Sequence, residues 1–265
     1  MKPKFDMMPE LCDLPLETCR DGSTFQIWPH TLPQICAVSP TLCPRSKNWP
    51  EQKIMSGWWV LPRDPNDPPP EELIYFLPCK PVYIGFGSMT GNPEFCAKLS
   101  TLAIRGLYLA QTKGLLLRGW AGLIRESLDR STSEGQTLYD RARVNVFEID
   151  ACLHEWLFPQ CLAVVHHGGA GTLAAGIRAG VPSIVCATQG DQPFHGSLIK
   201  RAGIGKYVAL IGSKALTAEA LAEAITEVIA VQSVINAARA MSGHVQQEDG
   251  GDEFNRLYSQ DGGIL

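Results

Sequence analysis

The sequence predicts an α/β fold in which a parallel sheet is covered by helices on both faces, and two observations support this. From about residue 80 onward, short apolar runs alternate with segments whose apolar residues recur at helical spacing. The apolar runs themselves are almost uninterrupted, which is typical of strands that are buried on both faces. Strands and helices that alternate in this way form a Rossmann-like sheet, whose ligands bind at the carboxyl ends of the strands.

The composition excludes several classes of protein. The 265 residues are 45% apolar, enough to bury a core, and their formal net charge of -4 provides no basic surplus for binding nucleic acid. No stretch approaches the roughly 18 to 20 apolar residues of a membrane-spanning helix. The first residues lack the apolar segment of a signal peptide, so a cytoplasmic protein is expected. The nine cysteines include no C-x-x-C pair, and we expect reduced thiols and no metal site.

The first 70 residues differ from the rest of the chain. They contain scattered prolines and cysteines, and only Gln34–Val38 has the pattern of a short strand. Residues 64–70 include four prolines, which exclude a helix interior or a central strand and indicate a linker. We therefore predict three segments, 1–70, 71–245 and 246–265, of which the second is the sheet domain.

Within residues 71–245 we predict five strands. In chain order they are Pro81–Ser88, Leu115–Leu117, Val144–Ile149, Leu162–His166 and Pro182–Ala187. The clearest helices carry an apolar stripe or a starting signal. One carries Phe95, Leu99, Leu102, Gly106 and Leu109, one spans Phe194–Arg201, and one begins after Thr217 as a helix cap, with Leu221, Ile225, Val228 and Ile229 on one face.

A glycine-rich turn follows the fourth strand, with the sequence His167-Gly168-Gly169-Ala170-Gly171-Thr172 before the next helix. Glycines let the backbone approach a ligand closely, and the N-terminus of the following helix presents free N–H groups to an anion. The pattern therefore predicts a phosphate site, to which Thr172 adds a hydroxyl and His167 a ring N–H. The alternative is a tight turn without a ligand. Because His166 points to the opposite face from His167, we expect it to be a packed core residue.

Polar residues gather where all five predicted strands end. These loops are Gly85–Ser88, Arg118–Gly122, Asp150–His154, His166–Thr172 and Gly190–Gln192. Their convergence predicts a pocket for a phosphorylated ligand rich in hydroxyl groups. Asp191 can accept two sugar-hydroxyl hydrogen bonds, and Gln192 can both donate and accept. The alternative for this pair is a helix cap before Pro193.

Together these motifs resemble the donor-binding signature of the family 1 glycosyltransferases, and in particular sterol 3-beta-glucosyltransferases. The resemblance rests on Leu153–Pro159, His166–Thr172, Ala179–Pro182 and Gly190–Gln192, with further similarity at Asn48–Pro50, Gly57–Trp59, Val82–Met89 and Arg118–Leu123. It implies the C-terminal half of a two-domain GT-B glycosyltransferase. Residues 1–70 would be a remnant of the N-terminal acceptor domain and the linker, 71–245 the domain that binds a UDP-sugar, and 246–265 a tail or closing helix.

The resemblance also implies roles for individual residues. Ser88 and the turn formed by Gly168, Gly169, Ala170, Gly171 and Thr172 would hold the diphosphate, with His167 on a phosphate oxygen. Asp191 and Gln192 would hold sugar hydroxyls, the loop from Ile149 to Leu153 would meet uracil and ribose, Trp120 would lie near the base or the sugar, and Arg118 would line the cleft. Leu153 stands where relatives usually carry proline. The UDP-sugar is the co-substrate, and neither a further cofactor nor a metal is expected.

The implied reaction is an inverting, metal-independent transfer of a hexose, with glucose favoured, to a hydroxyl of a lipophilic acceptor such as a sterol. In this family the catalytic base is a histidine of the N-terminal domain. Within this chain His30, His154 and His195 are the candidates, and the last two fit donor-side or structural roles better. Two alternatives remain: a nucleotide-sugar-binding subunit that needs a separate acceptor-domain partner, and a fold relative without activity. A lipophilic acceptor would also suit a peripheral position at a membrane.

Overall fold

The computed structural model describes residues 16–18, 24–26, 34–49, 51, 53–60, 69–87 and 91–260. The chain divides into two units, one formed by residues 1–59 with 249–265 and the other by residues 60–248. The division thus falls at residues 59–60 and 248–249, whereas the sequence pattern predicts boundaries at 70 and 245. Ser88 and His30 lie outside the described residues.

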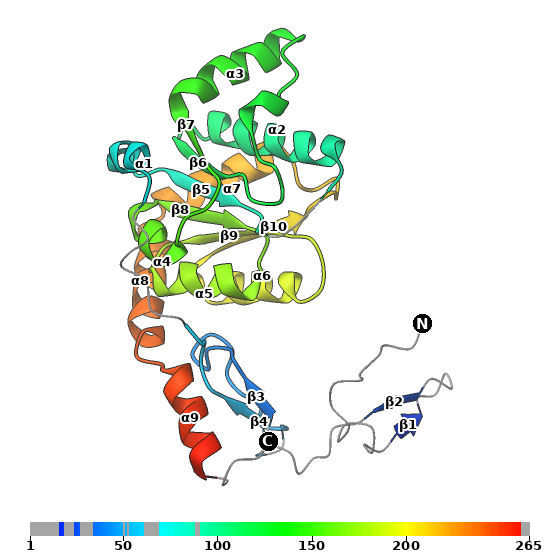
Figure 1. Cartoon of the computed structure of the whole chain (residues 1–265), viewed down its shortest axis with the longest axis vertical. Coiled ribbons are helices and arrows are strands. Elements are labelled where there is room, and N and C mark those ends of the chain that lie inside the picture. The colour runs from blue at the N-terminus through cyan, green and yellow to red at the C-terminus, as the bar shows by residue number, and fades with distance from the viewer. Residues whose placement is uncertain are drawn as a thin grey trace. The chain divides into compact units, whose positions relative to one another are not determined.

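The larger unit contains a six-stranded parallel sheet (Figure 1). Its strands are β5 (Val82–Gly85), β6 (Gly114–Leu117), β7 (Val146–Ile149), β8 (Ala163–His166), β9 (Ser183–Ala187) and β10 (Gly205–Leu210). The spatial order is β10-β9-β8-β5-β6-β7. Counted from β5, this is the order 3-2-1-4-5-6 of the dinucleotide-binding α/β sheet, so the predicted fold class is confirmed.

Both faces of the sheet are buried, as the apolar runs predict. Along β5, Val82 and Ile84 pack into an apolar cluster on one face, and Tyr83 packs into a second cluster on the other. The first cluster includes residues of α2 (Pro93–Leu109), α3 (Ser133–Asn145) and α7 (Ala218–Ala230). The second includes residues of α1 (Glu71–Phe76), α4 (His154–Leu157) and α5 (Ala170–Arg178). In Figure 1, α5 and α6 (Gln192–Arg201) lie on the side of the sheet opposite α2 and α7.

Capping residues and close packing explain where the long helices begin and how they meet. Asn92 accepts a hydrogen bond from the N–H of Phe95 at 2.8 Å at the start of α2. Thr217 accepts one from the N–H of Ala220 at 3.1 Å, which confirms the predicted start of α7. A methyl group on Gly106 would lie 2.9 Å from Leu221 Cδ2, so the absence of a side chain at Gly106 lets α2 and α7 approach closely.

The helix α8 (Gln232–Val245) packs beside α5, and hydrogen-bond donors from α8 and the residue after it satisfy the C-terminal end of α5. The Ser242 hydroxyl and the Gln246 amide both donate to the carbonyl oxygen of Arg178, at 2.6 Å and 2.7 Å. Arg178 is the last residue of α5, and its carbonyl would otherwise lack an intrahelical partner. The last turn of α5 is therefore satisfied by residues more than 60 positions later in the chain.

Several elements differ from the sequence prediction. The third strand begins at Val146 instead of Val144, because α3 continues to Asn145. The strand β10 and the helices α1, α3 and α8 were not predicted. The described residues contain no helix that is both long and apolar enough to cross a lipid bilayer.

The smaller unit combines short strands with the last helix. β1 (Leu16–Thr18) pairs with β2 (Thr24–Gln26) in antiparallel orientation, and β3 (Gln34–Cys36) pairs with β4 (Lys53–Met55) in parallel. The strand predicted at Gln34–Val38 is therefore present over its first three residues. The helix α9 (Gly250–Gln260) belongs to the same unit, where Phe254 packs edge-on against Trp59 with ring centroids 5.1 Å apart.

Candidate nucleotide-sugar site

The candidate site lies at the carboxyl ends of β5 and β8, which are neighbours in the sheet. The strand order reverses between these two strands, and α/β sheets of this kind bind their ligands in the crevice at such a reversal. The loops after the two strands are in contact. Gly87 has φ +59°, and a methyl group there would lie 2.6 Å from Cε1 of His167. The predicted convergence of these two loops is therefore present.

The turn after β8 has a geometry that requires glycine. Gly168 has φ +91°, and a methyl group there would lie 3.1 Å from the carbonyl oxygen of Gln192 and 2.9 Å from Val185 Cγ1. Two buried histidines hold the same residue in place. The N–H of Gly168 donates to His166 Nδ1 at 3.1 Å, and its carbonyl accepts from His195 Nδ1 at 2.7 Å.

The helix α5 starts directly after this turn, at Ala170, with Gly169 as its cap residue and no side-chain cap. The first helical hydrogen bond of α5 is donated by the N–H of Leu173 to the carbonyl oxygen of Gly169, at 2.9 Å. The N–H groups of Ala170, Gly171 and Thr172 precede this bond and have no partner within the helix. Ala170 and Gly171 are exposed. The geometry therefore suits an anion at this end of the helix, as the sequence predicts.

His167 adds a polar group beside the turn. Its side chain is 8% exposed, and its buried Nδ1 has no hydrogen-bond partner among the described residues. Burial lowers the pKa of His167, and the charge of Asp191 opposes that shift. A neutral imidazole carries one N–H, which can donate a hydrogen bond to a phosphate oxygen at this position.

His166 is fully buried, and burial lowers its pKa to about 3. The expectation that it is a packed core histidine is confirmed.

The structure separates the roles of Asp191 and Gln192. Asp191 is exposed, its side chain does not cap α6, and its Oδ2 lies 3.8 Å from Nε2 of His195. Gln192 is 8% exposed, and its Oε1 accepts from the N–H groups of Thr188 at 2.7 Å and Gln189 at 3.2 Å. Asp191 thus remains suited to a sugar hydroxyl. The amide oxygen of Gln192 holds the turn after β9, and the sugar contact implied for Gln192 stays a prediction.

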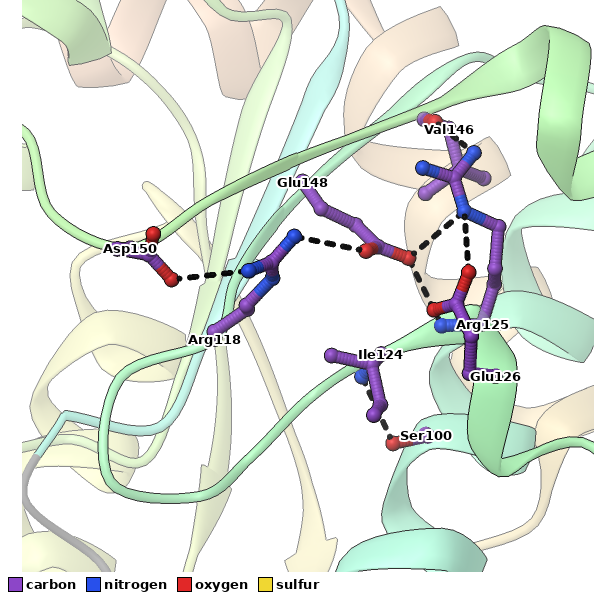
Figure 2. A network of polar contacts seen from close by, with 8 residues as sticks. All are labelled: Ser100, Arg118, Ile124, Arg125, Glu126, Val146, Glu148 and Asp150. Atoms are coloured by element: carbon purple, nitrogen blue, oxygen red, sulfur yellow. Dashed lines mark hydrogen bonds and ion pairs between the residues drawn. The ribbon is translucent and has the colours of Figure 1, made fainter.

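The guanidinium of Arg118 is paired with two carboxylates. Figure 2 shows its guanidinium between two carboxylates, with Nη2 3.5 Å from Glu148 and Nη1 3.2 Å from Asp150. The side chain ties the ends of β6 and β7 together, and the lining role implied for Arg118 stays a prediction. Trp120, two residues further along, is 72% exposed.

The loop after β7 begins and ends with residues that are packed in the structure. Ile149 is 4% exposed in the apolar core, and its carbonyl accepts from the N–H of Arg118 at 2.8 Å. The Ile149 side chain is part of the core, and the uracil and ribose contact implied for the loop from Ile149 to Leu153 stays a prediction. Leu153 is half-buried and precedes α4 as its cap residue. His154 Nε2 lies 3.2 Å from the Tyr83 hydroxyl, so His154 is a packing residue, as expected.

Two further residues organise this edge: Glu148, which the sequence does not single out, and His195, for which it favours a donor-side or structural role without naming its partner. Glu148 is buried between two arginines, and His195 fixes the glycine turn. The position of His195 one helical turn after Asp191 is a signal that sequence reasoning could have used. A cavity of about 640 Å³ between α2 and α3 includes Tyr108 and Arg141 in its lining and lies towards the amino ends of β6 and β7, away from this edge. The described residues form no group of three or more His, Cys, Asp or Glu side chains that could hold a metal ion.

Residues 135–252 match the family model described as erythromycin biosynthesis protein CIII-like, C-terminal domain. The chain is 38% identical over 172 residues to a sterol 3-beta-glucosyltransferase of Arabidopsis thaliana, covering 63% of this chain and 24% of the relative. It is 31% identical over 228 residues to a sterol 3-beta-glucosyltransferase of Aspergillus clavatus, covering 84% of this chain and 15% of the relative. The chain therefore spans a quarter or less of the length of these relatives.

Solved structures show the same fold. A glycosyltransferase of kitacinnamycin matches with a TM-score of 0.62 at 18% identity, over 86% of this chain and 54% of that one. The calicheamicin glycosyltransferase CalG4 matches with a TM-score of 0.59 at 18% identity, over 87% of this chain and 54% of that one. This chain thus has the fold of GT-B glycosyltransferases. The chain is therefore similar to the erythromycin biosynthesis protein CIII-like C-terminal domain over residues 135–252, and to the two sterol 3-beta-glucosyltransferases over a larger part of its length.

Proposed function

We propose that this chain binds a UDP-sugar and serves as the donor-binding part of a glycosyltransferase that transfers glucose to a hydroxyl of a lipophilic acceptor such as a sterol. One observation carries the proposal: the uncapped N-terminus of α5 follows a glycine turn beside the buried, unpartnered Nδ1 of His167. The two relatives described above are named sterol 3-beta-glucosyltransferases, which supports glucose as the sugar and a sterol as the acceptor.

The proposed ligand has a diphosphate in the middle, with a sugar on one side and a nucleoside on the other. The diphosphate lies against the N–H groups at the start of α5, and His167 donates to one of its oxygens. Asp191, on the loop after the neighbouring strand β9, accepts hydrogen bonds from sugar hydroxyls. The nucleoside then extends towards the loops after β6 and β7.

In the proposed reaction the acceptor hydroxyl attacks the anomeric carbon from the face opposite the diphosphate. The bond between that carbon and the diphosphate oxygen breaks, and UDP leaves with the electron pair, which inverts the configuration. The α5 N-terminus and His167 stabilise the negative charge that develops on the leaving phosphate without any rearrangement. The proton of the acceptor hydroxyl passes to a general base, a role for which the described histidines His154 and His195 are not placed because both are packed.

Calorimetric titration of UDP and UDP-glucose into the full chain tests the donor site. His167→Ala should weaken binding of both ligands, because both carry the diphosphate. Asp191→Ala should weaken UDP-glucose and leave UDP unchanged, because only the former carries the sugar. Asp140→Ala, an exposed carboxylate on α3, is the matched control and should change neither affinity. Absence of UDP binding to the folded wild-type chain would refute the proposal.

Transfer to an acceptor is tested separately. The full chain is incubated with UDP-glucose and a sterol, alone and with an acceptor domain supplied as a second chain, and the steryl glucoside is quantified. Product from the chain alone supports a complete enzyme, and product only with the second chain supports a donor-binding subunit. UDP-glucose binding without product in either case would contradict the transferase proposal and leave a binding protein.

A further inference from the structure

The cavity of about 640 Å³ between α2 and α3 is separate from the candidate nucleotide-sugar site. The two helices lie next to each other and pack into the same apolar cluster (Figure 1). α3 buries only Gly135, Leu138 and Ala142, and two of these residues have little or no side chain, so a space remains between the helices. Its volume is within the range of roughly 300–1,000 Å³ in which proteins bind small molecules.

Apolar side chains form one wall of this cavity. Leu107 and Leu138 line it from the buried side, and Tyr108 and Leu109 in the last turn of α2 border it while 43% and 41% exposed. Three of these residues, Tyr108, Leu109 and Leu138, also line a smaller cavity of about 250 Å³ towards the start of α3. The two cavities are therefore adjacent parts of one groove, here called the α2–α3 groove, which has room for an extended apolar chain.

Charged side chains are distributed unevenly along the α2–α3 groove. Near the start of α3 the charges are matched, because Arg105 lies 3.4 Å from Glu134 and 3.0 Å from Glu219. At the other end, the described residues that line the larger cavity include Lys113 and Arg141 and no aspartate or glutamate. Neither of these two cations forms an ion pair with another described residue. The groove thus has one end with unmatched positive charge.

The ends of α2 and α3 lie beside these cations, and a helix C-terminus carries about half a negative charge, which disfavours an anion. Part of that charge is already compensated, because the N–H groups of Gln111 and Thr112 donate to carbonyl oxygens in the last turn of α2 at 3.1 Å and 3.2 Å. The side-chain amide of Asn145 likewise donates to the carbonyl oxygen of Arg141 at 3.0 Å. The full charges of Lys113 and Arg141 exceed what remains, so this end of the groove attracts an anion.

We propose that the α2–α3 groove binds an amphiphile that has one anionic head group, a carboxylate or a phosphate, and an apolar chain. The head group lies at Lys113 and Arg141, and the chain lies along the apolar wall towards the start of α3. The opposite orientation would bring the anion to Glu134, where the positive charge of Arg105 is already paired. A guanidinium and an ammonium both donate hydrogen bonds to anionic oxygens, and these bonds are stronger than those between neutral groups.

This ligand is different from both substrates of the proposed function. The groove lies at the amino ends of β6 and β7, whereas the candidate nucleotide-sugar site lies at the carboxyl ends of the strands. A UDP-sugar has no apolar chain for the wall, and a sterol has no charge for Lys113 and Arg141. The proposal therefore goes beyond the proposed function and assigns a second ligand to another part of the fold.

The first experiment compares probes that have the head group, the chain or both. Calorimetry measures binding of decanoate, decyl phosphate, decanol and acetate to the full chain, each below the concentration at which it forms micelles. Decanoate and decyl phosphate should bind with one molecule per chain, and the tighter of the two identifies the preferred head group. Decanol and acetate should each bind at least about tenfold more weakly. Decanol as tight as decanoate would overturn the role of the cations, and acetate as tight as decanoate would overturn the role of the apolar wall.

Variants then locate the head group. Arg141→Gln and Lys113→Gln should each weaken decanoate on the order of tenfold, because each removes a charged donor. Arg143→Gln is the matched control, since Arg143 is an exposed arginine of α3 that does not line the cavity, and it should leave the affinity unchanged. Equal losses in all three variants would indicate attraction to positive charge in general and would overturn the proposed site.

A further variant tests whether the chain lies inside the groove. Ala142 is buried and lines the cavity, so Ala142→Leu takes up part of the space and should weaken decanoate on the order of tenfold with both cations intact. If Ala142→Leu does not fold by circular dichroism, Tyr108→Asp at the exposed rim takes its place. Hydrogen exchange provides an independent location, because bound decanoate should slow exchange in residues 107–113 and 138–146. Protection elsewhere but not in these segments would overturn the proposal.

These outcomes are separate from those that test the donor site. Decyl phosphate should bind with the same affinity in the presence and absence of UDP, and competition between them would place its phosphate in the nucleotide site instead of the groove. A folded wild-type chain that binds neither decanoate nor decyl phosphate would overturn the inference, whatever its affinity for UDP. A chain that binds decanoate at the groove but does not bind UDP would refute the proposed function and leave the inference standing.

Discussion

Replacing Gly171 with alanine tests whether the first turn of α5 receives a ligand. Gly171 is the second residue of the helix, it is exposed, and a methyl group there meets no atom within 4 Å. Because alanine is favoured over glycine in helices by up to about 1 kcal/mol, Gly171→Ala should raise the free energy of unfolding by about 0.5 kcal/mol. The same methyl group would stand among the N–H groups that a phosphate must approach to about 2.9 Å. UDP affinity should therefore fall about tenfold, or roughly 1.4 kcal/mol.

Gly168→Ala is the matched comparison, because it adds the same methyl group at the same turn with the opposite effect on stability. The left-handed backbone at φ +91° costs an alanine about 1–2 kcal/mol. The contacts at 2.9 Å and 3.1 Å add overpacking of about 1–3 kcal/mol, so we expect a loss of about 2–5 kcal/mol in total. Urea unfolding followed by circular dichroism measures stability, and calorimetry measures UDP binding. Wild-type UDP affinity in Gly171→Ala would refute a phosphate at the first turn of α5.

Three further predictions concern the packing that supports the site. Burial lowers the pKa of His166 to about 3, so the unfolded chain binds a proton first as the pH falls. The free energy of unfolding should then drop by up to about 1.4 kcal/mol per pH unit below about pH 6.5, and His166→Gln should flatten this dependence in urea titrations between about pH 7 and pH 5. An unchanged slope would contradict the role of His166. Tyr83→Phe removes the hydrogen bond to His154 and should cost about 0.5–1.5 kcal/mol by urea unfolding, whereas no loss would show that this bond is not stabilising. Leu221→Ala removes the side chain that packs against Gly106 and should lower the free energy of unfolding by about 2–5 kcal/mol. The unfolding midpoint in urea should fall, and the phosphate turn should not be affected directly. A loss of stability below about 1 kcal/mol would mean that α2 and α7 move together and close the cavity.

The sequence predicts the central strands well because their signal is local. β5, β6, β8 and β9 are continuous apolar runs with almost every residue buried, and such runs are unlike any surface element. β10 lies at the edge of the sheet with half-buried residues such as Lys206 and Tyr207, which weaken the pattern. α3 is largely polar and buries only Gly135, Leu138 and Ala142, so its helical stripe is too narrow to recognise.

The parts of the site that can be predicted are likewise those whose signal is local in the sequence. The glycine turn and the start of α5 are predictable, because glycine spacing and the strand-to-helix change are written in consecutive residues. The partners of Arg118, Ile149 and Gln192 depend on contacts with other segments or on the local turn, and no spacing rule reveals them. The same holds for Glu148, whose importance comes from two arginines 30 and 23 positions away in the chain.

The capping of α5 by α8 sets the smallest piece of this protein in which the turn can be studied. A fragment that ends before Ser242 would still contain His167, the glycines and Asp191, yet the last carbonyl of α5 would lose both of its donors. The helix that presents its first N–H groups to a ligand would then be free to unwind from its other end. Dissection of the protein for binding studies therefore needs the chain through at least Gln246, and shorter fragments would report on fraying of α5 instead of ligand recognition.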